Sequence, residues 1–176
     1  MEGRMFGTRW AMAGTLLAVG LQCYAQNSLA ADSLSRARQL VAQARAFPEL
    51  DRPSNEIVAL AARLEVNSTQ LGKFRKANVK ARDHRYSALT REFNRERTLI
   101  AQLERKLRRP QMLNTSRFPP TPDLARGGGP PGEAHQKMLA EQSQRLHAAQ
   151  AKLLDALRML TRHYDQQLRI IASVRS

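Results

Sequence analysis

The 176-residue chain is poor in cysteine and in aromatic residues: it has one cysteine, Cys23, and aromatics make up 5% of it. Because Cys23 lies near the N-terminus, removal of that segment would leave no disulfide and no thiolate metal site. Alanine, leucine, glutamine and arginine are abundant instead, which is typical of long helices rather than of a large globular core. The sequence therefore predicts an all-α protein stabilised by helix packing.

Acidic residues are also scarce. The chain has 15 Asp and Glu residues against 29 Lys and Arg residues, which gives a formal net charge of +14. Such a surface attracts anions: nucleic acid, anionic lipid or lipopolysaccharide, or acidic protein segments. Charge alone does not choose among these partners, so the compartment of the protein has to decide.

The N-terminal segment, residues 1–31, indicates a compartment. Arg4 and Arg9 precede an uncharged run that extends to Ala31, and residues 10–21 have the length of the apolar part of a signal peptide. The alternative is an uncleaved inner-membrane anchor, because the uncharged run is just long enough to cross a bilayer. Both interpretations predict a periplasmic or exported protein.

The next long stretch, residues 54–109, lacks proline and has a single glycine, Gly72. Its apolar residues recur at steps of three and four, which predicts one long helix of roughly 84 Å. The seam then shifts, so that Leu89 lies eleven residues after Asn78, and such a step predicts a local unwinding of a left-handed supercoil. The seam consists of Ile57, Leu60, Leu64, Leu71, Phe74, Ala81, Tyr86, Leu89, Phe93, Ile100, Leu103 and Leu107.

The rest of the chain supplies partners for this helix. Residues 32–47 predict a short helix, and residues 110–132, with six prolines and four glycines, predict a linker. Residues 133–174 predict a last helix with a similar mixed periodicity. We therefore expect residues 32–176 to form one helical domain, a long antiparallel helical hairpin or coiled coil with the short helix at its open end. The seam of the last helix consists of Leu139, Leu146, Ala149, Leu153, Leu157, Leu160, Tyr164, Leu168 and Ile171.

Residues that could bind a metal are few and scattered. His135 with Met138, and Met159 with His163, could each place a sulfur and an imidazole on one helix face. Two ligands do not complete a metal site, so the sequence predicts no metal and no cofactor.

Carboxylates are equally unpromising for catalysis. Glu92 and Glu96 share a helix face, but Arg91, Arg95 and Arg97 surround them. We interpret this face as a salt-bridged helix surface rather than as a carboxyl pair with a raised pKa. No serine or threonine has a recognisable nucleophile setting, so the sequence predicts a protein that is not an enzyme.

The most distinctive local feature of the sequence is a run of basic residues in the middle of the predicted long helix. Charge runs are commonly solvated helix faces, and the functional alternative is an anion-binding surface, to which each basic residue contributes about 1 kcal/mol near an anionic membrane. The predicted anion- or partner-binding residues are Lys73, Arg75, Lys76, Lys80, Arg82, Arg85, Arg91 and Arg95.

In size, charge and helix layout the chain is similar to the basic periplasmic Skp/OmpH chaperones, which are exported helical-hairpin proteins of bacterial envelopes. No shared motif carries this likeness. We expect a non-catalytic exported coiled-coil protein that scaffolds or chaperones other envelope proteins or binds anionic surfaces, with the helix seams also able to form a homo-oligomer. The alternatives are an accessory or structural subunit of a secretion or conjugation apparatus, and a nucleic-acid-binding coiled coil. The last requires that the chain is not exported, and the chain lacks the aromatic platform on which single strands stack.

Overall fold

Helices make up most of the described part of the chain. The computed structural model describes residues 32–77, 79–80, 83–119 and 132–175, and no strand occurs within these ranges, so the all-α class is confirmed. The N-terminal segment predicted as a signal peptide or anchor lies outside them. The elements in chain order are a helical segment at residues 32–44, η1 (Pro48–Leu50), α2 (Asp51–Lys76), α3 (His84–Leu107), η2 (Thr115–Arg117) and α4 (Glu133–Arg175).

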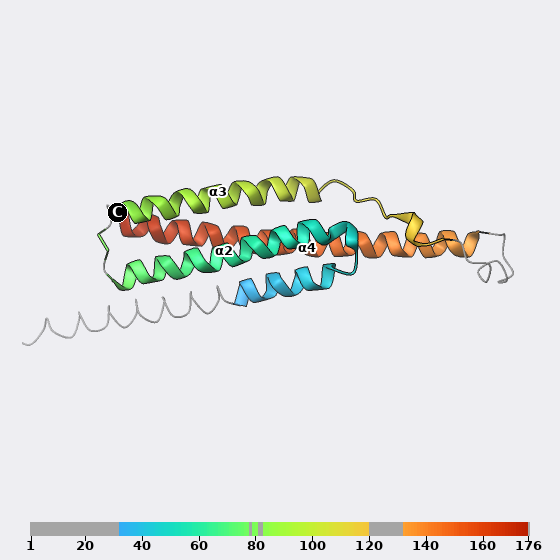
Figure 1. The fold of residues 1–176 in the computed structure, drawn as a ribbon, viewed down its shortest axis with the longest axis horizontal. Coiled ribbons are helices and arrows are strands. Elements are labelled where there is room, and N and C mark those ends of the chain that lie inside the picture. Colours follow the sequence, from blue (N-terminus) through green and yellow to red (C-terminus); the bar gives the residue numbers. More distant parts are fainter. Residues whose placement is uncertain (1–31, 78, 81–82, 120–131, 176) are drawn as a thin grey trace, which may run out of the picture.

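The predicted single helix over residues 54–109 is wrong, because the chain reverses between α2 and α3 (Figure 1). At the end of α2, the amide of Val79 donates to the carbonyl oxygen of Phe74 at 3.1 Å, a bond that closes a helix terminus. Asp83 then caps α3, since its carboxylate accepts from the amide of Arg85 at 2.9 Å. The eleven-residue step from Asn78 to Leu89 therefore spans a turn and not an unwound supercoil.

The start of α2 also differs from the prediction. The helix begins at Asp51 rather than at Ser54, with Pro53 as its third residue. Proline is tolerated there because the first amides of a helix have no intrahelical acceptor. Ser54 lies inside the helix and is buried, and its hydroxyl has no hydrogen-bond partner among the described residues. The short N-terminal helix ends at residue 44, three residues earlier than predicted.

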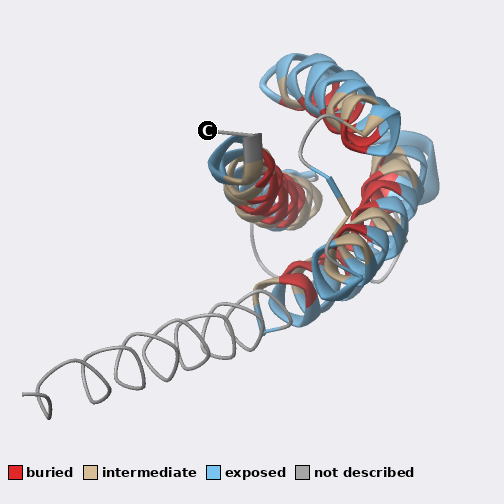
Figure 2. Cartoon of the chain, turned by 90° about the vertical axis from the view of Figure 1, so that its left-hand side faces the viewer, coloured by how far each residue is buried: buried red, intermediate tan, exposed pale blue. Residues whose placement is uncertain are grey.

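The helices form a bundle in place of a two-helix hairpin. In Figure 1, α3 runs antiparallel to both α2 and α4, so α2 and α4 are parallel and end beside each other. Seen from the end, residues 32–44, α2 and α3 make an arc, and α4 lies in its concave side with its buried residues facing the arc (Figure 2). An arginine–carboxylate contact at 2.5 Å, between Arg38 and Glu65, joins the N-terminal helix to α2.

The core uses the predicted seams, but within a bundle of shorter helices. Leu64 of α2, Phe93 of α3 and Leu153 and Tyr164 of α4 are fully buried, and the rings of Phe93 and Tyr164 meet edge to face at 5.8 Å. Each such buried side chain stabilises the fold by about 1.5–3 kcal/mol. Most seam residues bury one another inside a single chain, whereas Phe74, Leu139 and Leu168 are only partly buried.

The last helix has the predicted extent, with Glu133–Arg175 observed against 133–174 predicted. Its first turns project beyond the bundle, alongside the first part of the linker (Figure 1). That part is anchored through Glu49, which accepts from the amide of Asn114 at 3.1 Å. Within the described residues, no helix is both long and apolar enough to span a membrane.

Candidate functional site: the basic end of the bundle

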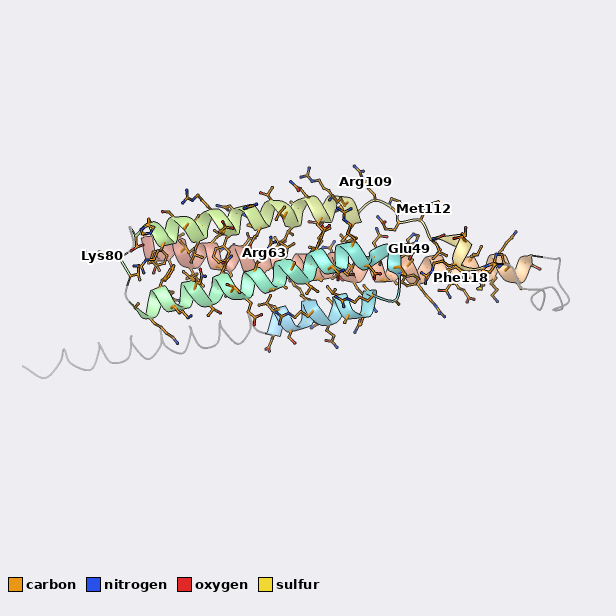
Figure 3. The ribbon with its side chains drawn as sticks, in the orientation of Figure 1. Glu49, Arg63, Lys80, Arg109, Met112 and Phe118 are labelled. Carbon is orange, nitrogen blue, oxygen red and sulfur yellow. The ribbon has the colours of Figure 1, made fainter. Side chains whose placement is uncertain are left out.

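Five of the eight basic residues predicted from the sequence lie at one end of the bundle, which we call the basic end. It comprises the last turn of α2, the turn to α3, the first turn of α3 and the C-terminal part of α4. Figure 3 places Lys80 there, opposite the end that carries Arg109 and Met112. Arg82 lies outside the described residues. The exposed residues at the basic end are Lys73, Arg75, Lys76, Lys80 and Arg85, and Arg91 and Arg95 are exposed further along α3.

Arg85 has a structural role that the sequence did not reveal. Its guanidinium donates to both carboxylate oxygens of Asp83, at 3.0 and 2.9 Å, and lies 5.3 Å from the centre of the Phe74 ring. The hydrogen bonds from Arg85 hold the pKa of the Asp83 carboxyl well below its usual range, and Asp83 raises the pKa of Arg85. Phe74 in turn meets Tyr86 edge to face at 5.9 Å. Through these contacts with Asp83 and Phe74, Arg85 stabilises the turn between α2 and α3.

The electrostatic balance of the basic end is strongly positive. Among the described residues from 73 to 85, five Lys and Arg side chains face a single acid, Asp83, whose charge Arg85 already neutralises. Some of this charge stabilises the fold, because Lys73, Arg75 and Lys76 lie at the negative end of the α2 dipole. The side chains of Lys73, Arg75 and Lys76 in this last turn nevertheless remain exposed.

A groove between α2 and α4 adds residues that the sequence reasoning missed. It has a volume of about 660 Å³, and Arg75 of α2 and Arg162 and Arg169 of α4 supply its positive charge. Arg162 and Arg169 are seven residues apart and so share a helix face, but their spacing could indicate a site only once the position of α2 was known. The remaining lining residues are Asp165, Gln166, Ile170 and Ser173.

Arg97, which sequence reasoning placed on the outer basic surface, joins two helices. Its Nε atom lies 2.9 Å from a carboxylate oxygen of Asp165, so the ion pair connects α3 to α4. Both side chains are partly exposed, which limits its contribution to stability to less than about 1 kcal/mol. Through this ion pair, Arg97 binds Asp165, the one carboxylate among the residues that line the groove.

The interpretation of Glu96 as part of a surface is wrong, because its side chain is only 3% exposed. Burial raises the pKa of Glu96, while hydrogen bonds with Tyr164 and Asn67 and the charge of Arg63 lower it in part. Its position follows from spacing, since Glu96 lies three residues after Phe93 and four before Ile100, on the buried face. Glu92, by contrast, is exposed.

His163 belongs to the same buried polar cluster. Its Nε2 atom lies 3.2 Å from the side-chain amide nitrogen of Gln167 and 3.5 Å from the hydroxyl of Ser68. Burial lowers the pKa of His163. Within the described part of the chain, no three His, Cys, Asp or Glu residues are placed to hold a metal ion. We interpret the cluster as a device that fixes how the helices pair, because a polar group in a core is satisfied in only one register.

The structure thus offers two candidate sites, the solvent-exposed basic end and the polar cluster in the core. A partner can reach only the first of them without opening the bundle. Comparison of the chain with protein-family models, with curated proteins and with solved structures finds no match.

Proposed function

We propose that the protein is a non-catalytic, exported binding protein of the bacterial envelope that attaches to anionic surfaces or acidic partners through the basic end of its bundle. The observation that carries this proposal is the collection of exposed Lys and Arg side chains at one end of the fold. Two parallel helices that end together, and the turn that enters α3, bring these charges into one place. Such a surface attracts anions electrostatically and does not require one particular partner sequence.

The closed core changes the kind of partner that we propose. Chaperones that hold unfolded clients expose apolar grooves, whereas the only large hydrophobic side chains exposed in the described residues are Val66 and Met112. A partner that is recognised by its negative charge is therefore favoured over an apolar client.

Vesicle binding tests the proposal on the full chain. The three lysines of the basic end are replaced in the variant Lys73→Gln/Lys76→Gln/Lys80→Gln, and binding to vesicles that contain phosphatidylglycerol is measured by co-sedimentation. At roughly 1 kcal/mol per basic residue, we expect binding to weaken by about 100-fold at low salt. Binding by the parent should also weaken as salt is added.

The chain provides a matched control, because its other lysines are Lys106, Lys137 and Lys152, away from the basic end. Replacing these three by glutamine removes the same net charge and should change vesicle binding much less. Equal losses in the two triple variants would mean that only net charge matters, and the proposal would fail. It would also fail if the first variant bound as tightly as the parent.

The export part of the proposal has its own test. Residues 1–40 are fused to a reporter enzyme that becomes active only outside the cytoplasm. Activity supports an envelope location, whereas an inactive but intact fusion would overturn that location and favour a nucleic-acid partner instead.

A further inference from the structure

The groove between α2 and α4 has a more specific arrangement than the rest of the basic end. Ser68 of α2 lies opposite His163 of α4, at 3.5 Å between their side chains. Because the two helices are parallel, Arg75, seven residues after Ser68, is level with Ile170 and so lies next to Arg169 along the bundle axis (Figure 1). The two α4 arginines are about 10.5 Å apart along that helix.

The chemistry of the lining favours an anion that carries more than one negative charge. Three guanidinium groups face one carboxylate, and that carboxylate, on Asp165, is already paired with Arg97 at 2.9 Å. The hydroxyl of Ser173 donates to the carbonyl oxygen of Ile170 at 2.9 Å, so its oxygen is not aimed as a donor into the groove. The arginines are therefore the groups that define what binds.

Guanidinium groups are planar forks whose parallel N–H bonds match two oxygens of one phosphate. A lysine ammonium at the same place would supply charge without that geometry. The groove volume, about 660 Å³, falls within the usual range for small-molecule sites. It is large enough for a phosphate group together with part of the molecule that bears it.

We propose that this groove binds a terminal phosphate or diphosphate group, held by Arg75, Arg162 and Arg169. The inference rests on the proposed function, because it assigns a ligand class to the same end of the bundle. The basic turn attracts an anionic surface over a distance, and the groove selects phosphomonoesters and diphosphates over phosphodiesters. The phosphate can belong to a lipid headgroup or to a soluble molecule.

The test compares vesicles of matched surface potential that contain either phosphatidic acid, a phosphomonoester, or phosphatidylglycerol, a phosphodiester. Inorganic pyrophosphate, followed by calorimetry, is the soluble probe. We expect the parent to prefer phosphatidic acid and to lose that preference when pyrophosphate is added. The variant Arg162→Gln/Arg169→Gln should bind phosphatidic acid and pyrophosphate at least about tenfold more weakly, because it loses two charge-assisted forks.

Two further variants separate the fork from its charge and its position. Arg162→Lys/Arg169→Lys keeps both charges and should still lose the preference for phosphatidic acid. Arg91→Gln/Arg95→Gln removes two exposed arginines of α3 outside the groove and should keep the preference. Circular dichroism of each variant checks that the helices are intact.

Each result bears on one proposal or the other. A parent with no preference for phosphatidic acid and no affinity for pyrophosphate overturns the groove proposal, while lysine-dependent binding to phosphatidylglycerol would still support the proposed function. Equal effects of the groove and α3 variants also overturn it. Pyrophosphate binding without any vesicle binding would keep the groove, identify its phosphate as soluble and overturn the proposed attachment to lipid surfaces.

Discussion

The phenol of Tyr164, on α4, donates a 3.0 Å hydrogen bond to the backbone carbonyl oxygen of Leu60, on α2, inside the bundle. The Tyr164 phenol also interacts with the side chain of Glu96 on α3. This interaction lowers the pKa of Glu96 in part, while burial, the larger effect, raises it. Three helices thus meet in one polar chain that runs from Leu60 through Tyr164 to Glu96.

The first prediction concerns the hydroxyl of Tyr164. The substitution Tyr164→Phe keeps the ring against Phe93 but removes the hydrogen bond to the Leu60 carbonyl and leaves Glu96 with Asn67 alone, so we expect a loss of about 1–2 kcal/mol in the free energy of unfolding. Urea unfolding followed by circular dichroism measures it. Tyr86→Phe is the control, because Tyr86 is also buried and its ring also makes an edge-to-face contact, with Phe74. Equal losses in both variants would contradict the role of the polar chain.

The second prediction concerns the pH dependence that Glu96 contributes. Because burial raises its pKa in the folded state above the ordinary value of 4.5, the folded protein holds this proton more tightly than the unfolded chain does. The contribution of Glu96 to stability is therefore complete below pH 4.5 and decreases as pH rises through the folded pKa. Glu96→Gln lacks this loss, so its stability relative to the parent should improve from pH 4 to pH 7.

Unfolding free energies at these two pH values check the sign. Glu92→Gln, which removes an exposed carboxylate one turn away, controls for the change in net charge. A Glu96→Gln variant whose deficit grows toward neutral pH would show that the ionised carboxylate is the form that the core stabilises.

The third prediction has the opposite sign. Burial lowers the pKa of His163 below its ordinary value of 6.5, so the unfolded chain takes up a proton that the folded protein does not. The stability that a neutral His163 allows is present above pH 6.5 and is lost as pH falls toward the folded pKa. We expect His163→Gln to lose less stability than the parent between pH 7 and pH 5. His147→Gln, at an exposed position, should instead follow the parent curve.

The buried residues of the helices could be read from the sequence, because burial follows a local period. Leu64, Phe93 and Leu157 were placed on the seams, and all are fully buried. The same period includes Glu96, which was missed because its sequence neighbours, Arg95 and Arg97, are charged. The three-and-four spacing was in this case the more reliable signal.

The turn between α2 and α3 is harder to predict from the sequence than the buried residues are. Residues 77–83 contain neither proline nor glycine, so no local breaker marks the end of a helix. The reversal depends on the cap at Asp83 and on the packing of Phe74 against Tyr86, which forms only after the chain has turned. The groove was missed for the same reason, because Arg75 meets Arg162 and Arg169 only in the folded bundle.

The fourth prediction concerns the C-terminus of α3, where Gln150 of α4 supplies the missing hydrogen bonds. Its amide nitrogen donates to the carbonyl oxygen of Leu107 and, at 2.9 Å, to that of Arg109. Gln150→Ala should cost about 1–3 kcal/mol, because it leaves a buried carbonyl without a donor. Gln150→Glu should cost more at neutral pH, since a carboxylate would face two carbonyl oxygens at the negative end of a helix dipole. Gln144→Ala, an exposed change on the same helix, is the control, and thermal unfolding measures all three.

The last prediction tests the chain reversal itself. Spin labels on cysteines at Arg52 and Lys106, both exposed, lie near the same end of the bundle because α2 and α3 are antiparallel (Figure 1). Neighbouring helix axes are about 8–10 Å apart, so we expect a label distance below about 30 Å in a pulsed electron resonance measurement, with Cys23 replaced by serine. One continuous helix would separate the same positions by roughly 81 Å, beyond the reach of the method. A second pair at Arg52 and Lys80 should give a longer distance than the first. A reversed order of the two distances, or no measurable coupling between Arg52 and Lys106, would support one continuous helix over residues 54–109 instead. It would also separate the basic turn from the groove on α4, and both binding proposals would then lose their common site.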